Sequence, residues 1–269
     1  MIMPVSFKLD NYDLDQFVRQ ASEFGQDRYG FAVTPNVDHL IRFHSDAAFR
    51  ALYADSTYVL LDSRFLSHLF ALTRGARIAV CTGSDLTAQL FARVMRPDDT
   101  IVLIGGARSQ AKMLADRYGL EKLRHFNPPM GFINDPAAVE ECLQFIESNS
   151  PFRYCLLGVG SPQQEILAQQ LKARGKARGL ALCVGASINF LTGAERRAPR
   201  WIQRIGAEWI FRLAGDPRRL AKRYLVRGPR VFALLPFTNI VLRPPGAVAI
   251  SAAVALKATT GEIRTQVST

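Results

Sequence analysis

Short apolar runs recur along the first two thirds of the chain, and amphipathic stretches separate most of them. Strands that are apolar throughout and alternate with helices are typical of a parallel sheet covered by helices on both faces. The pattern therefore predicts a Rossmann-like α/β fold with a mostly parallel sheet. The runs are Tyr29–Val33, Tyr58–Leu61, Arg77–Cys81, Thr100–Ile104, Arg153–Leu157 and Leu180–Val184.

Small and polar residues follow several of these runs, at the points where the strands are expected to end. Gly105 and Gly106 follow one run, Gly158–Pro162 follows another, and Gly185–Ser187 follows a third. In open α/β sheets the ligand crevice lies at the carboxyl ends of the strands. We therefore expect these turns to contribute to a binding site.

The positive charge of the chain is concentrated in one segment. The formal net charge is +11, and residues 195–230 contain eleven Arg or Lys against three acidic residues. A strongly basic protein can bind nucleic acid, anionic lipid or phosphorylated substrates. The concentration in one segment indicates a dedicated anionic surface or ligand there.

The basic segment has aromatic residues among its arginines at roughly helical spacing, which predicts short basic helices. The apolar runs Val231–Leu242 and Gly246–Leu256 are shorter than the ~18–20 residues that a spanning helix needs. We expect an interfacial helix docked on anionic headgroups instead. The chain thus divides into an α/β domain (1–194), a basic amphipathic helical appendage that contacts a membrane surface (195–245), and an apolar, then disordered tail (246–269).

The cysteines and the N-terminus favour a reducing compartment. The four cysteines are widely spaced and form no CxxC pair. The first residues lack the basic and apolar segments of a secretory signal. We expect a reduced, cytoplasmic protein.

Thr34-Pro35-Asn36 is the first candidate for chemistry. It follows an apolar run and precedes an expected helix from about Asp38, so it offers a hydroxyl and an amide at a strand end. The alternative is an ordinary N-cap and turn, because Thr and Asn favour such positions and Pro35 suits the first helical turn.

Asp62 ends another run and is followed by Ser63 and apolar residues. A carboxylate at a crevice mouth can act as a general base when burial raises its pKa. The alternative is an N-cap for a helix that begins near Ser63, and one residue could hold both roles.

Two further turns are candidates for binding phosphate or a nucleotide. Thr82-Gly83-Ser84-Asp85 would present hydroxyls and backbone N–H groups at a helix N-terminus, or simply cap that helix. Gly158-Val159-Gly160-Ser161-Pro162 continues into Gln163-Gln164-Glu165, where backbone donors would meet a diphosphate or uracil and Gln164 or Glu165 a base or ribose. The turn is not GxGxxG, which argues against a Rossmann dinucleotide enzyme.

The sequence shows no convincing metal site. Asp13-Leu14-Asp15 has the DxD form but is better explained as a helix cap with acidic first-turn residues. The histidines His39, His44, His68 and His125 lack metal-site spacing. Without a metal, charge on a diphosphate must be met by cations and helix dipoles, and the available arginines are Arg212, Arg218, Arg219 and Arg223.

Taken together, these motifs resemble the WecG/TagA/CpsF family of bacterial glycosyltransferases, also called glycosyltransferase family 26. The resemblance covers about residues 28–225. Beyond the motifs above, it includes Leu86, Met130-Gly131-Phe132, Val184-Gly185, Phe190-Leu191, Gly193, Arg197-Ala198-Pro199, Trp201, Gln203-Arg204, Gly206, Glu208-Trp209, Arg212-Leu213 and Pro217-Arg218-Arg219-Leu220.

The resemblance implies an inverting transferase without metal or other cofactor. It would move a sugar from a UDP-sugar donor to a polyprenyl-diphosphate-linked saccharide during assembly of a cell-surface polysaccharide, on the inner face of the cytoplasmic membrane. Asp62 would be the base, beside Thr34 and Asn36. Gln164 and the arginines of the appendage would serve the donor, and the appendage would help to close the site.

The chain departs from the family pattern where Ser63 replaces a glycine, Val80 an arginine and Asn189 an aspartate. These positions are expected to line the pocket, so the donor stays open between UDP-glucose and a UDP-N-acetylhexosamine such as UDP-N-acetylmannosamine. A homo-oligomer also stays open. One rival hypothesis is a basic nucleic-acid-binding protein, which leaves the carboxylate and turn residues at several strand ends unused. The other is a Rossmann-type cofactor enzyme, against which the missing glycine pattern argues.

Overall fold

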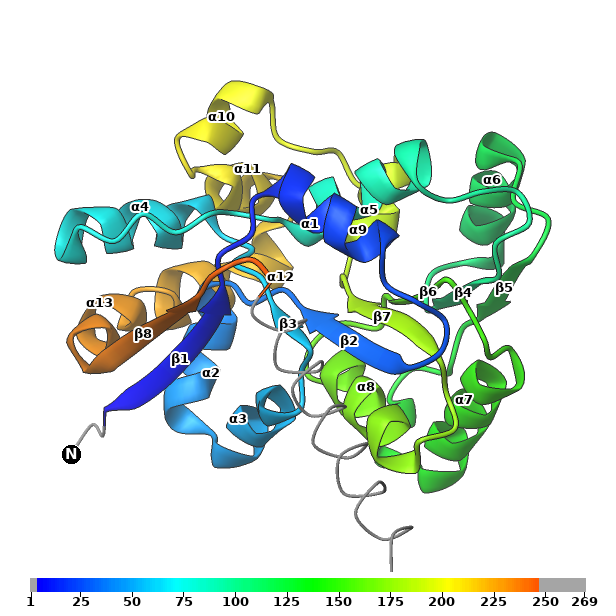
Figure 1. Ribbon diagram of the computed structural model, residues 1–269. Coiled ribbons are helices and arrows are strands. Elements are labelled where there is room, and N and C mark those ends of the chain that lie inside the picture. Colours follow the sequence, from blue (N-terminus) through cyan, green and yellow to red (C-terminus); the bar gives the residue numbers. More distant parts are fainter. Residues whose placement is uncertain (1–3, 247–269) are drawn as a thin grey trace, which may run out of the picture.

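The computed structural model describes residues 4–246, and within them six parallel strands form the central sheet. Their order across the sheet is β3-β2-β7-β6-β4-β5. The expected α/β fold with a mostly parallel sheet is confirmed (Figure 1). The strands are β2 (Tyr29–Val33), β3 (Tyr58–Val59), β4 (Ile101–Ile104), β5 (Leu123–Phe126), β6 (Tyr154–Leu157) and β7 (Gly179–Cys183).

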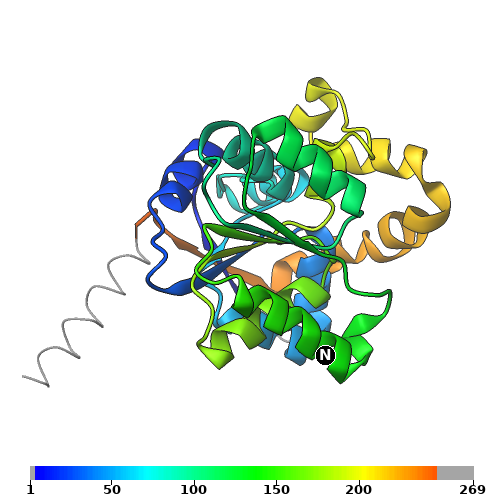
Figure 2. The same cartoon turned by 90° about the vertical axis from the view of Figure 1, so that its right-hand side faces the viewer.

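Helices cover both faces of this sheet, and Figure 2 shows it nearly edge-on between the two helical layers. One layer contains α2 (Val37–Ser45), α3 (Ala47–Ala54), α7 (Pro136–Ser148) and α8 (Gln163–Arg174). The other contains α1 (Leu14–Ser22), α5 (Gly83–Arg93), α6 (Arg108–Tyr118) and α9 (Ser187–Leu191). The helix α4 (Arg64–Arg74) extends beside the β3 edge (Figure 1).

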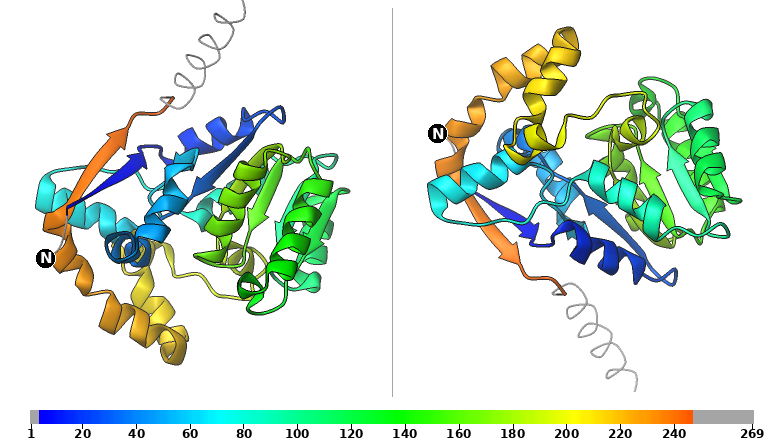
Figure 3. Two further views of the ribbon diagram at one scale, coloured as in Figure 1. Left: turned by 90° about the horizontal axis from the view of Figure 1, so that it is seen from below. Right: turned by 90° about the horizontal axis from the view of Figure 1, so that it is seen from above.

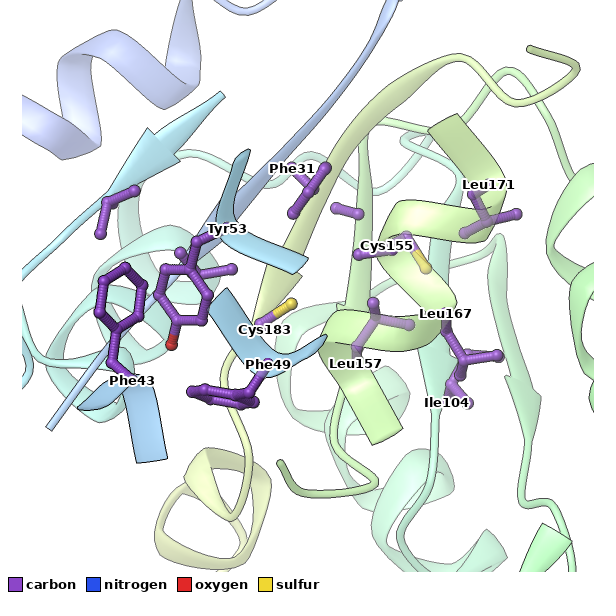
Figure 4. Packing of buried hydrophobic residues seen from close by; sticks show 14 of the residues in the cluster. Phe31, Phe43, Phe49, Tyr53, Ile104, Cys155, Leu157, Leu167, Leu171 and Cys183 are labelled. Atoms are coloured by element: carbon purple, nitrogen blue, oxygen red, sulfur yellow. The ribbon is translucent and has the colours of Figure 1, made fainter. Parts of the chain in front are cut away.

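Alternation along the strands explains why both faces are covered. In β6, Cys155 and Leu157 belong to the cluster under α7 and α8, whereas Tyr154 and Leu156 belong to the cluster under α1 and α5. Successive side chains of a strand point to opposite faces, so a strand without polar residues needs helices on both sides. Figure 4 shows the cluster under α7 and α8. Leu157, Leu167 and Leu171 lie on one side of it, and the aromatic rings of α2 and α3 lie on the other.

A second, two-stranded sheet joins the two ends of the described chain. Its strands, β1 (Val5–Asp10) and β8 (Thr238–Arg243), are parallel and lie side by side (Figure 3). Asp10 accepts hydrogen bonds from the Val59 backbone (2.7 Å) and from Arg243 (2.6 Å). These bonds connect the two-stranded sheet to β3, the edge strand of the central sheet. The C-terminal segment is therefore held to the fold by a strand as well as by helices.

The interfacial-helix prediction for Val231–Leu242 is wrong, because the second half of this run is strand β8. The first half forms α13 (Arg230–Leu234) and the 3₁₀ turn η3 (Leu235–Phe237). Val231 and Leu235 are buried in the core, so these apolar residues have a partner inside the protein. The run Gly246–Leu256 and the expected tail lie outside the described residues, except for Gly246.

The run Arg77–Cys81 was also wrongly predicted to be a strand. It has no regular secondary structure and joins no ladder of the central sheet, although the Cys81 N–H donates to the Leu61 carbonyl (3.0 Å) beyond the end of β3. Conversely, periodicity missed β5, which reads Leu-Arg-His-Phe. As an edge strand, β5 is only partly buried and tolerates polar residues.

Past α9 the chain forms short helices that cross the carboxyl-end edge of the sheet. They are α10 (Arg200–Arg204), α11 (Glu208–Gly215), α12 (Pro217–Ala221), the π-helical turn η2 (Lys222–Arg227) and α13. In Figure 1 they lie beside α4. Within residues 4–246, no helix has both the length and the apolarity to cross a membrane.

Candidate active site

Asp62 lies just past the carboxyl end of β3, where its backbone N–H donates to the Pro35 carbonyl (2.8 Å). The N-cap of α4 is Ser63, whose hydroxyl accepts from the Leu66 N–H (3.1 Å). The capping alternative for Asp62 is therefore wrong. The Asp62 carboxylate does not cap α4, and Asp62 lines two cavities.

Thr34 and Asn36 lie beside Asp62 at the end of the neighbouring strand, β2. The Thr34 hydroxyl donates to the Cys183 carbonyl (2.9 Å) and so ties β2 to β7. Asn36 caps α2 by accepting from the Asp38 N–H (3.1 Å), as the capping alternative predicts. The same Asn36 oxygen also accepts from Arg223 (3.3 Å), so the N-terminus of α2 is hydrogen-bonded to the basic segment.

Two cavities meet at this point. The first, which we call the polar cavity, has a volume of about 270 Å³ and reaches from Asp62 to the turns after β6 and β7. The second, the apolar cavity, has a volume of about 260 Å³ and runs between α4 and the C-terminal helices, past Phe65, Trp209 and Phe232. Residues that line both are Asn36, Asp38, Asp62, Glu208, Arg212 and Arg223.

The surroundings of Asp62 raise its pKa to about 7. Burial is the largest cause, and the negative charges of Glu208 and Asp85 add to it. The Arg212 charge and a hydrogen bond from the Gly83 backbone act in the opposite direction. A carboxyl group with a pKa near neutrality can accept a proton and release it again at physiological pH.

Asp85 anchors a charged cluster next to this base. Its carboxylate lies 2.7 Å from Arg197 and 3.0 Å from Arg64, and Arg64 in turn lies 3.2 Å from Glu208. Burial acts to raise the pKa of Asp85, but the bonds from Arg197, Thr82 and Arg64 outweigh it and lower the pKa to about 2. Asp85 thus stays charged and holds the segment after α9 and the start of α11 against α5.

The structure brings many of the predicted site residues to the polar cavity. Those that line it are Thr34, Asn36, Asp62, Ser84, Gly160, Gln164, Gly185, Arg212, Arg219 and Arg223. Predicted residues that are not among its lining are Thr82, Gly83, Gly105, Gly106, Gly158, Pro162, Glu165, Asn189 and Arg218. Several of the second group support the first.

Gln164 and Glu165 illustrate this support. Gln164 accepts from the Gly185 N–H (2.9 Å) and donates to Glu165 (2.9 Å), whose carboxylate lies 3.5 Å from the His39 ring. Glu165 is fully buried and Gln164 nearly so. The pair links the turns after β6 and β7 to the first turn of α2.

The glycine turns after β4 and β6 pack against each other. Gly105 has a φ of +92°, and a Cβ at this position would lie 3.0 Å from the Gly158 carbonyl carbon. A side chain would therefore be strained and would push the two turns apart. Gly105 and Gly158 keep the neighbouring strand ends close, and Gly106 continues the same turn.

The polar cavity is also lined by residues that the sequence placed in candidate turns or in the family motif without assigning them a role in the site. Ser187 and Phe190 follow β7, and the guanidinium of Arg212 lies 5.4 Å from the centre of the Phe190 ring. Arg197 and Glu208 belong to the family motif, but nothing in their local sequence marks them as site residues. Ser161 and Ala186 lie in the predicted turns, and Val184 and Ala198 lie in the family motif. The lining residues that were not predicted as site residues are Asp38, His39 and Arg42.

Among residues 4–246, no group of three or more His, Cys, Asp or Glu side chains is arranged to hold a metal ion. Asp13 caps α1 through the Gln16 N–H (2.8 Å), which confirms the capping explanation of the DxD sequence. Asp15 instead pairs with Arg93 (3.1 Å).

A parallel sheet with a crevice at its carboxyl ends, a carboxylate of raised pKa and a row of arginines define an α/β protein suited to an anionic ligand. The sequence model of the WecG/TagA/CpsF family of glycosyl transferases matches residues 2–243. The chain therefore belongs to this family, and it is an enzyme that transfers sugars.

Proposed function

We propose that the protein moves a sugar from a UDP-sugar to a polyprenyl-diphosphate-linked saccharide, with Asp62 as the base. The observation that carries this proposal is the meeting of two unlike cavities at one carboxylate. A transferase needs a separate place for each substrate and a proton acceptor where the two meet. Asp62 lines both cavities and has a pKa near 7.

The polar cavity suits the nucleotide donor. Arg212, Arg219 and Arg223 line it and can offset the charge of a diphosphate. Ser84 lies in the first turn of α5, where backbone N–H groups and the helix dipole also favour an anion. The donor is UDP-glucose or a UDP-N-acetylhexosamine such as UDP-N-acetylmannosamine.

The apolar cavity suits the acceptor. Its wall combines Phe65, Trp209 and Val231 with the charged residues near Asp62. A saccharide that carries a diphosphate and a polyprenyl chain offers this mixture of apolar and anionic groups. We place its reacting hydroxyl at Asp62 and its lipid toward Phe232, which is 57% exposed.

In the reaction, Asp62 takes the proton of the acceptor hydroxyl as the oxygen attacks the anomeric carbon of the donor sugar. The bond from this carbon to the phosphate oxygen breaks, and UDP leaves with the bonding electrons. Attack from the face opposite the leaving group inverts the anomeric centre. The arginines offset the charge that develops on the diphosphate, where a metal ion would otherwise be needed.

UDP binding in the presence of EDTA tests the donor class and the metal independence together. We expect UDP to bind with the same affinity, within about twofold, whether EDTA or magnesium is present, because the three arginines supply the charge. Isothermal titration calorimetry measures this, with NAD and single-stranded RNA as comparison ligands. Binding of NAD or RNA but not UDP would favour a rival function, and a strict need for magnesium would refute the metal-free site.

We also propose that residues 195–245 act as a membrane-contacting appendage to the catalytic unit of residues 1–194, on the cytoplasmic face of the membrane. The support is the exposure of large apolar side chains among the basic residues of its helices. They include Trp201 (65% exposed), Ile205 (61%), Leu225 (57%) and Val226 (60%). Such a mixture favours adsorption to anionic lipid surfaces.

Vesicle binding tests this appendage. Leu225→Ser with Val226→Ser should weaken binding to phosphatidylglycerol vesicles by about tenfold, because two exposed apolar side chains no longer enter the lipid interface. Co-sedimentation measures the loss, and binding of the unchanged protein should weaken as salt is raised. Met113→Ser on α6, which removes an apolar side chain that is 47% exposed and lies outside the appendage, is the control. Equal binding by all three proteins would show that the appendage does not contact lipid.

A further inference from the structure

The carboxylate of Glu195 lies between α9 and the arginines of the C-terminal helices. One of its oxygens is 3.8 Å from Arg212, and the other is 3.9 Å from Arg219. Asn189 donates its amide N–H to the second oxygen (3.2 Å). Glu195 is not among the residues that line either cavity, so it contacts the arginines from outside the cavities.

The direction of the Asn189 amide is set by a chain of hydrogen bonds that begins on the backbone. The Ala107 N–H donates to the Gln110 side-chain oxygen (2.8 Å), which leaves the Gln110 amide nitrogen to donate. That nitrogen donates to the Asn189 oxygen (3.0 Å) and to the Thr192 hydroxyl (2.9 Å). With its oxygen occupied in this way, Asn189 presents its amide nitrogen to Glu195.

Arg212 and Arg219 carry like charges and come from successive helices, α11 and α12. A shared carboxylate lowers the repulsion between them and brings both to the same wall of the polar cavity. The distances of 3.8 and 3.9 Å are longer than hydrogen bonds, so these contacts leave guanidinium N–H groups for another anion. The other contacts of the two arginines differ. The Arg212 guanidinium lies over the Phe190 ring, and Arg219 forms a salt bridge with Asp216 (2.6 Å).

We propose that Glu195, held by Asn189, is a positioning residue that gathers Arg212 and Arg219 to receive the diphosphate of the donor. This inference rests on the proposed function, which assigns the polar cavity to a nucleotide diphosphate. In this chain, where Glu195 lies beside it, the departure from the family's aspartate at position 189 is explained by the asparagine amide, which both accepts from Gln110 and donates to Glu195. An aspartate there would accept from Gln110 but would repel the carboxylate.

The test compares three variants: Asn189→Asp, Glu195→Gln, and the two changes together. Asn189→Asp should weaken UDP binding about tenfold because repulsion displaces Glu195, and Glu195→Gln should weaken it by about threefold to tenfold. The combined variant has the net charge of the unchanged protein, and the glutamine amide introduced at position 195 can donate to the carboxylate introduced at position 189. It should therefore bind UDP more tightly than Asn189→Asp alone.

The ratio of UDP to uridine affinity separates positioning from a general structural effect. Uridine lacks the diphosphate, so its binding should change by less than about twofold in all three variants. Glu140→Gln on the distant α7, which also removes a partly exposed carboxylate from an arginine, is the matched control and should leave both affinities unchanged.

Three results can be told apart. If the unchanged protein does not bind UDP, the proposed function fails. If it binds UDP but Asn189→Asp leaves the UDP to uridine ratio unchanged, only this inference is overturned. Equal losses for UDP and uridine, without recovery in the combined variant, would likewise overturn it and assign the pair a general role in folding.

Discussion

Asp62→Asn is expected to lower turnover by about a hundredfold or more while donor affinity changes little. The amide has nearly the same shape as the carboxylate, so the cavities keep their form, but it cannot accept the proton of the acceptor hydroxyl. Turnover on a soluble acceptor analogue and UDP affinity by calorimetry measure the two effects. Asp13→Asn is the matched control, because Asp13 caps α1 outside both cavities and asparagine is an equally good N-cap.

The pH dependence of turnover should report the ionisation of Asp62. Asp62 must be ionised to act as a base, so turnover should fall on the acidic side with a midpoint near its pKa of about 7. Glu208 raises this pKa by its negative charge, so Glu208→Gln should move the midpoint to lower pH. Activity of Asp62→Asn within a few-fold of the unchanged protein, or an acidic limb that persists in this variant, would remove Asp62 from the mechanism.

Thermal unfolding distinguishes lost chemistry from lost folding. The pKa of Asp62 is about 7 in the folded protein and near 4 in the unfolded chain. The unfolded chain therefore loses this proton first, and the stability contributed by the group falls as pH rises between the two values. At pH 8, where folded Asp62 is charged, Asp62→Asn should melt no lower than the unchanged protein.

The combined variant Arg212→Ala and Arg219→Ala is expected to lower kcat/KM by about a hundredfold to a thousandfold. Both guanidinium groups line the polar cavity, and their charges are needed most when the diphosphate leaves. Initial rates over a range of donor concentrations measure the loss. The fall in kcat should exceed the fall in UDP affinity, because the charge on UDP grows as the sugar bond breaks.

Arg200→Ala is the matched control for these arginines. Arg200 is an exposed residue of the same basic segment, at the start of α10, and it lines neither cavity. This control should keep turnover within about twofold on a soluble acceptor. Equal losses in the control and the combined variant would mean that the segment acts through its total charge rather than through a built donor site.

The central sheet could be predicted from sequence because its strands are apolar throughout and end in marked turns. Thr34, Asp62 and Gly185 follow β2, β3 and β7, and parallel strands bring their carboxyl ends to one edge. The pairing of β1 with β8 could not be found in this way. It joins residues more than two hundred positions apart, and local periodicity carries no information about such contacts.

Local sequence predicted the residue types of the site better than their roles. Glu165 is polar and follows a glycine-rich turn, so it was expected to contact the donor, yet it is fully buried and supports the site from within. Arg218 and Arg219 are neighbours in one basic run, but only Arg219 lines the polar cavity, because adjacent residues of a helix point in different directions. Which arginine meets the donor depends on helix orientation, which tertiary contacts determine.

Transfer of labelled sugar to lipid tests the central claim most directly. The purified protein would be incubated in EDTA with each labelled UDP-sugar and a short polyprenyl-diphosphate-linked saccharide, and the products would be separated by thin-layer chromatography. The account predicts that label from one UDP-sugar enters the lipid fraction, that equimolar UDP is released, and that Asp62→Asn abolishes both. Label that stays in the nucleotide fraction for all of these donors, or transfer that Asp62→Asn leaves unchanged, would contradict it.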